Sequence, residues 1–294
     1  MGRTYGIHGS YKMKYLKTPL RYPGGKSRVA PKLIEKFPKD IGEFREPFLG
    51  GGSVALLFSQ KYPHIPVWVN DKYEYLYHFW INLQKNGDDL SDALVEAKEN
   101  NLTEDLAREL FKSAKESISE ANSFDKAVLF WILNKCSYSG LTENSSFSAT
   151  ASRQNFTTRG ARNLKDISKV IKNWHITNLD YTDVMNDAES ERNNVFVFLD
   201  PPYKIKSFLY GTDAKMHKDF NHKDFVENCK ICPWDWMVTY NNDDELKEAY
   251  QDFHQEIFKI TYGMKHRADN KNKTELLVAN YDLYPPSPLE LLSV

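Results

Sequence analysis

Short apolar segments alternate with segments of helical periodicity along most of the chain, and this alternation limits the fold more than any other feature. Strands that alternate with helices form a largely parallel sheet, because each helix carries the chain back across it. The first five expected strands cover residues 44–48, 67–70, 175–178, 195–199 and 236–240. Two more, 256–262 and 275–281, flank the basic loop 263–273, a pattern typical of an antiparallel pair. The sequence therefore predicts an α/β fold.

A long segment of different character separates the second expected strand from the third. Apolar residues recur there at helical spacing from residue 90 to 118, and a buried helix is expected over 124–133. Residues 137–158 are rich in Ser, Thr and Asn, which suits a surface recognition loop. The expected organisation is an α/β domain, a helical second domain inserted into it, and flexible tails. Their bounds are 15–80 with 165–284 for the first, 81–164 for the insert, and 1–14 and 285–294 for the tails.

The composition excludes several classes of protein. With 294 residues, 41% of them hydrophobic, the chain can bury a full core and is not a disordered acidic chain. Its longest apolar stretch, near residues 127–133, is much shorter than the roughly 18 residues of a membrane span. The N-terminus lacks the apolar core of a secretory signal, and an odd number of cysteines, three, fits a reducing compartment. We expect a cytoplasmic protein without a membrane anchor.

The charges nearly cancel, with 39 Lys and Arg against 40 Asp and Glu, but they are unevenly placed. No acidic residue precedes Glu35, and a second basic segment from Arg153 to Lys172 is opposed only by Asp166. A third basic segment covers residues 265–273, whereas acidic residues gather at 183–191 and 243–248. Taken alone, each charged run is explained equally well as a solvent-exposed face of the protein. Three basic runs together are compatible with a polyanionic binding partner.

A glycine-rich turn follows the first expected strand, in residues 44–54. Gly50 and Gly52 let the backbone pass close to a ligand, and the helix expected over 54–58 begins beyond them. Asp71 ends the second strand, where a carboxylate can accept the two hydroxyl hydrogens of a ribose. Such a motif is often only a turn, but together with Asp71 it favours an adenosine-type ligand.

A second turn, Tyr22-Pro-Gly-Gly-Lys-Ser27, ends like a phosphate-binding loop. That interpretation fails because Leu20 occupies the position of the required first glycine. Lys26 can still bring a cation to a carboxylate. The alternative, a plain turn before a helix over residues 29–37, stays equally open.

The most informative motif is the apolar strand 195–199 followed by Asp200-Pro201-Pro202-Tyr203. The carboxyl edge of a parallel sheet is where ligands bind, and the two prolines keep their carbonyl acceptors while lacking backbone donors. The Asp200 carboxylate and the Pro201 carbonyl can accept the two hydrogens of one exocyclic amine. Tyr203 can stack on a base.

Together, these motifs resemble those of the Dam-like adenine-specific DNA methyltransferases of the alpha group, which use S-adenosylmethionine. Residues 20–26 resemble the family's N-terminal cofactor motif, 46–52 its glycine motif and 200–203 its catalytic tetrapeptide, and the insert lies where the alpha group has its target-recognition domain. Four further segments are similar: 134–141, 176–181, 209–211 with His217, and 262–264. The resemblance implies a Rossmann-like methyltransferase sheet with an inserted, mainly helical recognition domain.

By this resemblance, the chain methylates the N6 amine of adenine in DNA at specific sites, by direct transfer to a base flipped out of the duplex. The catalytic residues would be Asp200, Pro201, Pro202 and Tyr203. The cofactor-binding residues would be Tyr22 and Lys26 at the methionyl end, Phe48, Gly50 and Gly52 along the pocket, Asp71 at the ribose, Asp180 and Tyr181 at the adenine, and Asp200 facing both ligands.

The expected DNA-binding residues are Arg21, Tyr138, Ser139, Glu143, Arg153 and Arg159. Glu143 stands where Dam has an arginine that reads guanine, so GATC specificity is not expected; a carboxylate accepts from the cytosine amine instead. Tyr138 is the candidate to wedge into the duplex. The alternative for each is a surface loop residue.

Other functions explain less of the sequence. A nicotinamide-dependent oxidoreductase leaves residues 200–203 unexplained, and methyltransferases acting on cytosine or glutamine usually begin the tetrapeptide with Ser or Asn. An inactive DNA-binding relative would not need the intact Asp71, Asp200 and Tyr203. A zinc site formed by His217, His222, Cys229 and Cys232 is disfavoured, so no metal is expected. The expected partner is double-stranded DNA, with a cognate restriction endonuclease as a potential second. We expect a monomer in a bacterial cell or a phage-infected host.

Overall fold

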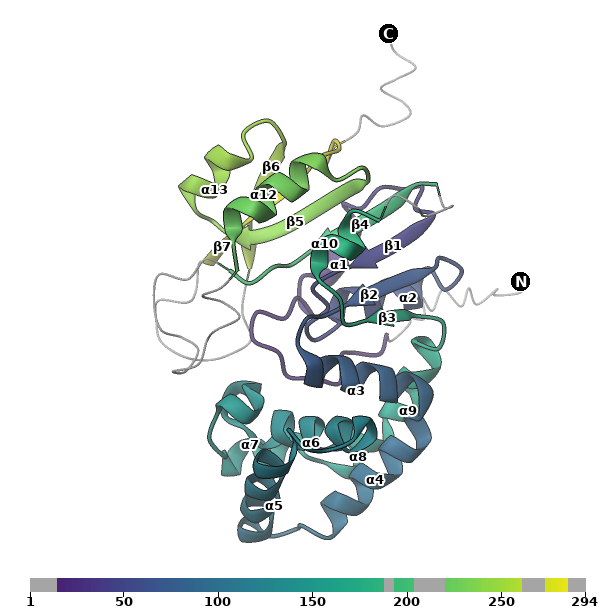
Figure 1. The fold of residues 1–294 in the computed structure, drawn as a ribbon, viewed down its shortest axis with the longest axis vertical. Coiled ribbons are helices and arrows are strands. Elements are labelled where there is room, and N and C mark those ends of the chain that lie inside the picture. The colour runs from purple at the N-terminus through teal and green to yellow at the C-terminus, as the bar shows by residue number, and fades with distance from the viewer. Residues whose placement is uncertain (1–14, 188–192, 204–219, 261–272, 285–294) are drawn as a thin grey trace, which may run out of the picture.

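The computed structural model describes residues 15–187, 193–203, 220–260 and 273–284, and within them seven strands form one sheet (Figure 1). The strand order is β3-β2-β1-β4-β5-β7-β6. The first five strands in sequence are parallel, whereas β7 is antiparallel to both β5 and β6. The bounds are β1 Glu43–Glu46, β2 Val67–Asn70, β3 His175–Thr177, β4 Val195–Leu199, β5 Asp235–Asn241, β6 His254–Ile260 and β7 Lys273–Ala279. The predicted fold class is confirmed.

The expected bounds agree with the observed strands to within two residues. β2 and β4 match the expectation at both ends, and β7 is displaced by two residues toward the N-terminus. As a result, Glu275 lies within β7 rather than at its start, in register with Asn241 of β5 and Phe258 of β6. The two expected tails, residues 209–211 with His217, residues 262–264 and most of the third basic segment lie outside the described residues.

The central strand β4 is buried on both faces, which explains its continuous run of apolar residues. Successive side chains point to opposite faces of a sheet. Phe196 accordingly belongs to one hydrophobic cluster, where its ring centroid lies 4.5 Å from that of Phe37. Val197 belongs to a second cluster, which includes Phe225 and Trp236. One core therefore lies on each side of the sheet.

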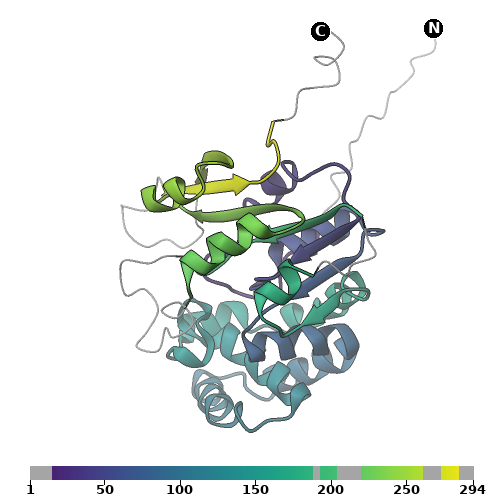
Figure 2. The same cartoon turned by 45° about the horizontal axis from the view of Figure 1, so that its top comes forward.

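Helices cover both faces. The first cluster takes residues from α1 (Ala30–Ile34), α2 (Ser53–Lys61), α3 (Glu74–Lys85) and α9 (Leu164–Val170). The second takes residues from α10 (Tyr181–Met185), α12 (His222–Ile231) and α13 (Asp244–Ala249), with α12 lying across the sheet in Figure 2. The helix expected over residues 29–37 is shorter than predicted, because beyond Glu35 the backbone hydrogen bonds join residues three positions apart, Lys36 to Leu33 and Phe37 to Ile34.

The inserted segment is mainly helical and lies at the end of the molecule away from β6 and β7 (Figures 1 and 2). Its elements are α4 (Gly87–Glu99), α5 (Glu104–Ser117), α6 (Ser123–Cys136), the short 3₁₀ turns η1 (Tyr138–Gly140) and η2 (Thr142–Asn144), α7 (Ala149–Asn155) and α8 (Thr158–Arg162). The prediction of a loop over residues 137–158 is therefore wrong for residues 149–155, which form α7. That helix buries only small side chains, Ala151 and Ser152, so it carries no apolar periodicity.

Helix α3 joins the insert to the sheet and was not predicted. Phe79 and Trp80 are fully buried, and Phe79 packs against Phe130 of α6 at a ring distance of 5.9 Å. Residues of α3 and α6 belong to the same hydrophobic cluster as β1 and β2. The expected boundary between residues 80 and 81 lies inside α3, and the two-domain division stays a prediction.

The strand order reverses once, between β1 and β4. From β1 the chain runs outward to β2 and β3, whereas β4 returns to the other side of β1 and continues to β5. At such a reversal, the loops after two adjacent parallel strands diverge and leave room for a ligand. The loops after β1 and β4, which carry the glycine motif and Asp200, meet there.

Candidate active site at the carboxyl ends of β1 and β4

Asp200 follows β4 directly, and its carboxylate is held by two other segments. The Lys26 Nζ atom donates to Asp200 Oδ1 and Oδ2 at 2.7 and 2.9 Å. The hydroxyl of Thr239, on the neighbouring strand β5, donates to Oδ1 at 3.0 Å. Tyr203 lies close by, because its hydroxyl oxygen accepts from Lys26 Nζ at 2.7 Å. Asp200 and Tyr203 of the predicted tetrapeptide are thus brought together around one cation.

Lys26 is 3% exposed, so its charge depends on protein acceptors. Besides Asp200 and Tyr203, its ammonium donates to the Gly24 carbonyl at 3.3 Å and lies 3.8 Å from Glu275 Oε2. The plain-turn interpretation of residues 22–27 therefore does not account for this lysine. Sequence reasoning expected a carboxylate partner for Lys26 but did not identify it as Asp200. Its placement at the methionyl end of the cofactor stays a prediction.

Thr239 and Glu275 are two site residues that sequence reasoning missed. Both are buried on strands. Glu275 carried a signal, since a charged residue in the strand Lys273–Ala279 otherwise rich in apolar residues is unusual. Burial raises the pKa of the Glu275 carboxyl to about 7, although the Lys26 ammonium pulls it down. Burial and the nearby Asp200 raise the pKa of Tyr203 well above its ordinary value.

The glycine motif after β1 forms a tight turn into α2. Gly50 and Gly52 have positive φ of 49° and 63°, which only glycine adopts without strain. The Tyr22 ring lies directly against this turn, because a Cβ atom on Gly50 would come within 2.8 Å of Tyr22 Cε1. Glu46, buried before the turn, accepts from the Ala55 backbone N–H at 2.8 Å, and burial raises the pKa of its carboxyl. The glycine motif and the N-terminal motif therefore form one site.

Asp71 reaches the glycine turn from the end of β2. Its Oδ2 accepts from the Gly50 N–H at 2.8 Å and its Oδ1 from the Tyr73 N–H at 3.0 Å. Burial raises the pKa of the Asp71 carboxyl to about 6. Each carboxylate oxygen has a further lone pair, so the group can accept two more hydrogens. Asp71 is thus an oriented acceptor beside the predicted pocket.

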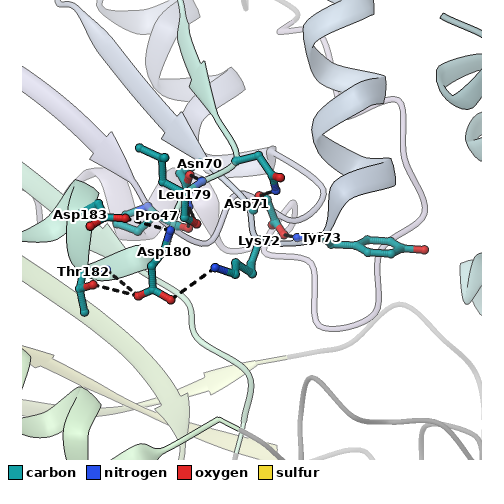
Figure 3. A network of polar contacts seen from close by, with 10 residues as sticks. Pro47, Asn70, Asp71, Lys72, Tyr73, Leu179, Asp180, Thr182 and Asp183 are labelled. Atoms are coloured by element: carbon teal, nitrogen blue, oxygen red, sulfur yellow. Dashed lines mark hydrogen bonds and ion pairs between the residues drawn. The ribbon is translucent and has the colours of Figure 1, made fainter. Parts of the chain in front are cut away.

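The buried amide of Asn70 connects the loops after three strands (Figure 3). Its Nδ2 donates to the carbonyls of Pro47 and Leu179 at 3.1 and 3.2 Å, and its Oδ1 accepts from the Leu179 N–H at 2.8 Å. Pro47 follows β1 and Leu179 follows β3. This single side chain therefore fixes the loops that carry Phe48, Asp71 and Asp180 relative to one another.

Asp180 and Tyr181 lie at the start of α10. Asp180 caps the helix, accepting from the Thr182 hydroxyl at 2.9 Å, and its other oxygen lies 3.7 Å from Lys72 Nζ (Figure 3). The ring of Tyr181 stacks on Phe48 with centroids 5.2 Å apart. The carboxylates of Asp71 and Asp180 thus lie at the same edge of the sheet as the stacked rings of Phe48 and Tyr181.

The predicted DNA-binding residues fall into two sets. Arg21 and Glu143 are tied into the fold. Arg21 exchanges backbone bonds with the Asn134 amide, and its Nη1 donates to the Ser137 carbonyl at 2.9 Å. Burial lowers the pKa of Arg21. The Tyr73 hydroxyl donates to Glu143 Oε1. The loop 137–144 is thereby anchored to the active-site edge.

The second set lies at the surface, with Ser139 half-buried and the other three residues exposed. Tyr138 is 51% exposed, and the next residue, Ser139, has a positive φ of 54°. Arg153 and Arg159 are exposed and make no ion pair with any described residue. The rest of the second basic segment is partly neutralised, through the pairs Arg162–Glu99, Lys165–Asp92 and Lys169–Asp166. The positive charge available to a polyanion is therefore smaller than the sequence indicates.

Comparison with known proteins identifies the family. The sequence model of the D12 class N6 adenine-specific DNA methyltransferases matches residues 22–267. The chain belongs to this family. The predicted resemblance is confirmed, and this methyltransferase catalyses site-specific adenine methylation of DNA with a methyl donor.

Three curated relatives agree. The type II methyltransferase M.MjaIII of Methanocaldococcus jannaschii is 28% identical over 74% of this chain and 79% of its own length. The type II methyltransferase M1.LlaDCHI of Lactococcus lactis is 23% identical over 89% of this chain and 94% of its own. The modification methylase StsI of Streptococcus sanguinis is 24% identical over 74% of this chain and 33% of its own.

The described residues of this methyltransferase contain no helix long and apolar enough to cross a bilayer and no group of three or more metal-binding side chains. Two of the four residues of the disfavoured zinc site are buried thiols with other contacts: Cys229 accepts from the Tyr250 hydroxyl, and Cys232 contacts the Met185 carbonyl. His217 lies outside the described residues. Both cysteines of the disfavoured zinc site thus have contacts within the fold.

Proposed function

We propose that the chain transfers a methyl group from S-adenosylmethionine to the N6 amine of adenine in double-stranded DNA, with Asp200 and Pro201 accepting the two hydrogens of that amine. The observation that carries the proposal is the position of the Asp200 carboxylate. It lies at the switch in strand order and is held by Lys26 and Thr239. The glycine turn, the loop next to it, lies beside Asp71.

The residues at this edge fit the proposed cofactor. Asp71, held by two backbone N–H groups, keeps lone pairs for the hydroxyls of a ribose. Phe48 and Tyr181 offer aromatic faces for an adenine, and Asp180 lies beside them for its polar edge. Gly50, Gly52, Tyr22 and Lys26 complete the proposed pocket. When bound, S-adenosylmethionine supplies an electrophilic methyl group on a sulfonium.

The amine of adenine is a weak nucleophile because its lone pair is delocalised into the ring. Two oriented acceptors draw its hydrogens out of the ring plane and stabilise the positive charge that develops on the nitrogen as the methyl arrives. Pro201 and Pro202 have no N–H that could compete for the same acceptors. In the proposal Tyr203 stacks on the base, which contributes about 1–3 kcal/mol and offsets part of the cost of flipping it from the duplex.

We assign the exposed residues of the insert to DNA. Tyr138 is the aromatic wedge, Arg153 and Arg159 contact phosphates, and Ser139 contributes a hydroxyl near the wedge. Glu143 accepts from an exocyclic amine of a base, as a carboxylate does with cytosine. Arg21 supports this loop through Asn134 and Ser137. The hydrogen bond from the Tyr73 hydroxyl to Glu143 supports an orientation of the Glu143 carboxylate toward the active-site edge.

The cellular context follows from the substrate. We propose that the enzyme acts as a monomer in the cytoplasm of a bacterial cell or a phage-infected host, where DNA is accessible to it. Its relatives are named type II methyltransferases and a modification methylase, which supports a cognate restriction endonuclease as a partner.

The role of Asp200 is tested by Asp200→Ala. We expect methylation to fall by at least about 10²-fold, because the variant loses an oriented acceptor that acts in the transition state. Nucleoside mass spectrometry of treated duplex DNA measures N6-methyladenine directly, and Asp252→Ala, an exposed carboxylate, is the control. A normally active Asp200→Ala enzyme contradicts the acceptor role.

The ribose contact is tested by Asp71→Asn. We expect S-adenosylhomocysteine to bind roughly 10- to 100-fold more weakly by calorimetry, since hydrogen bonds to a charged group are worth about 1.5–3 kcal/mol. In the unmodified protein affinity should fall as pH drops through about 6, where Asp71 takes up a proton and loses acceptor capacity. Asp71→Asn should lose most of this pH dependence. An unchanged pH profile in the variant would exclude the assignment.

The DNA surface is tested by Arg153→Ala and Arg159→Ala. If each arginine contacts one phosphate, each variant should lower the slope of log K against log salt by about 0.9 and weaken binding to all duplex sequences alike. Arg108→Ala is the matched control, because Arg108 is exposed on α5 and paired with Glu104. Fluorescence anisotropy at several salt concentrations gives the slopes. If Arg153→Ala and Arg159→Ala gave the same slope as the control Arg108→Ala, the assignment of this surface to DNA would be wrong.

A further inference from the structure

Glu275 is a buried carboxylate that the proposed reaction leaves without a role. It is 1% exposed and lies in β7, between Asn241 of β5 and Phe258 of β6 in the sheet register. A buried carboxylate normally costs stability unless it is paired or protonated. A carboxylate buried to this extent calls for a partner within the protein.

Its charged neighbour is Lys26. Glu275 Oε2 lies 3.8 Å from Lys26 Nζ, close enough for an ion pair but longer than a hydrogen bond. Glu275 also shares a side-chain hydrogen bond with Tyr203. The ammonium therefore lies between two carboxylates, with its hydrogens directed to Asp200, Tyr203 and the Gly24 carbonyl.

This arrangement conflicts with the proposed chemistry as it stands. Lys26 donates to both oxygens of Asp200, and Thr239 donates to Oδ1 as well. These three bonds leave one lone pair, on Oδ2, as the acceptor for a target amine. A cation held against Asp200 also opposes the positive charge that develops on the amine nitrogen. A shift of the ammonium away from Asp200 when the base enters relieves this repulsion, and for a buried cation such a shift is favourable only toward another anion.

We propose that Glu275 is a positioning residue for methyl transfer, taking the ammonium of Lys26 so that Asp200 is free of this cation when it accepts from the adenine amine. The proposal rests on the proposed role of Asp200. A movement of about 1 Å would bring the 3.8 Å separation to hydrogen-bond length. Tyr203, bonded to both Lys26 and Glu275, stays in contact with the ammonium in either position.

The charge state of Glu275 makes this exchange dependent on pH. Burial and the Asp200 carboxylate raise the pKa of Glu275, the Lys26 ammonium lowers it, and the result is about 7. Its described neighbours in register, Asn241 and Phe258, are uncharged. Below pH 7 Glu275 takes up a proton and no longer attracts the ammonium. The rate of methyl transfer should therefore rise as pH increases through about 7.

The test is Glu275→Gln, which keeps the shape of the side chain and removes its charge. We expect the single-turnover methylation rate to fall on the order of 10²-fold, because a misplaced group at the reacting centre typically costs this much. The rise in rate near pH 7 should disappear. Cofactor affinity should change little. Glu256→Gln on β6 is the matched control, since that carboxylate pairs with Lys36 away from the site.

A second variant separates positioning from a structural role. Glu275→Asp keeps the charge and should recover part of the rate together with the pH-dependent rise, whereas a purely structural contact would leave the pH profile of both variants like that of the unmodified enzyme. If Asp200→Ala is inactive while Glu275→Gln keeps a normal rate and profile, the inference about Glu275 fails alone. If Asp200→Ala is active, the proposed acceptor role fails first.

Discussion

The buried ammonium of Lys26 is the interaction on which the active-site edge depends. It links the N-terminal turn to the loop after β4 through Asp200 and Tyr203, and it lies near Glu275 on β7. Three segments far apart in the chain thus meet at one charge. Breaking a buried pair of this kind typically costs about 3–5 kcal/mol, because the remaining charge stays buried without compensation. In the proposed mechanism the same cation moves away from Asp200 during the reaction, so stability and catalysis would use the same contacts.

Much of the fold and part of the site follow from local sequence. The apolar run of β4 predicts a central strand, because only a strand covered on both faces carries no polar alternation. Asp71 and Asp200 were found from their positions after strands, since the carboxyl ends of parallel strands meet at one edge. The glycine turn was found from its composition, and the positive φ of Gly50 and Gly52 gives the physical reason for it. The family resemblance, confirmed by the match over residues 22–267, supplied the reaction.

The remainder depends on tertiary contacts that no local pattern encodes. Lys26 and Asp200 are 174 positions apart, and nothing near either residue indicates the other. Helix α3 is an exception, because its buried residues Leu76, Phe79, Trp80 and Leu83 recur three and four positions apart, a helical pattern that the sequence analysis did not use. Thr239 lies inside a strand and carries no sequence signal of its own, whereas Glu275 is marked only by its charge, and its partners lie far away in the chain. The neutralisation of Arg162 by Glu99 and of Lys165 by Asp92 likewise becomes visible only once the helices are packed.

The most direct test of this account is the free energy of unfolding of Lys26→Met, measured with urea from pH 5 to pH 9 beside Lys36→Met, whose partially exposed pair with Glu256 should matter little. Without the ammonium, the pKa of Glu275 should rise further above about 7 in the folded state. A carboxyl with a raised folded pKa loses stability as pH rises toward that pKa, so the deficit of Lys26→Met should grow with pH. A small deficit that does not change with pH would contradict the central role of Lys26.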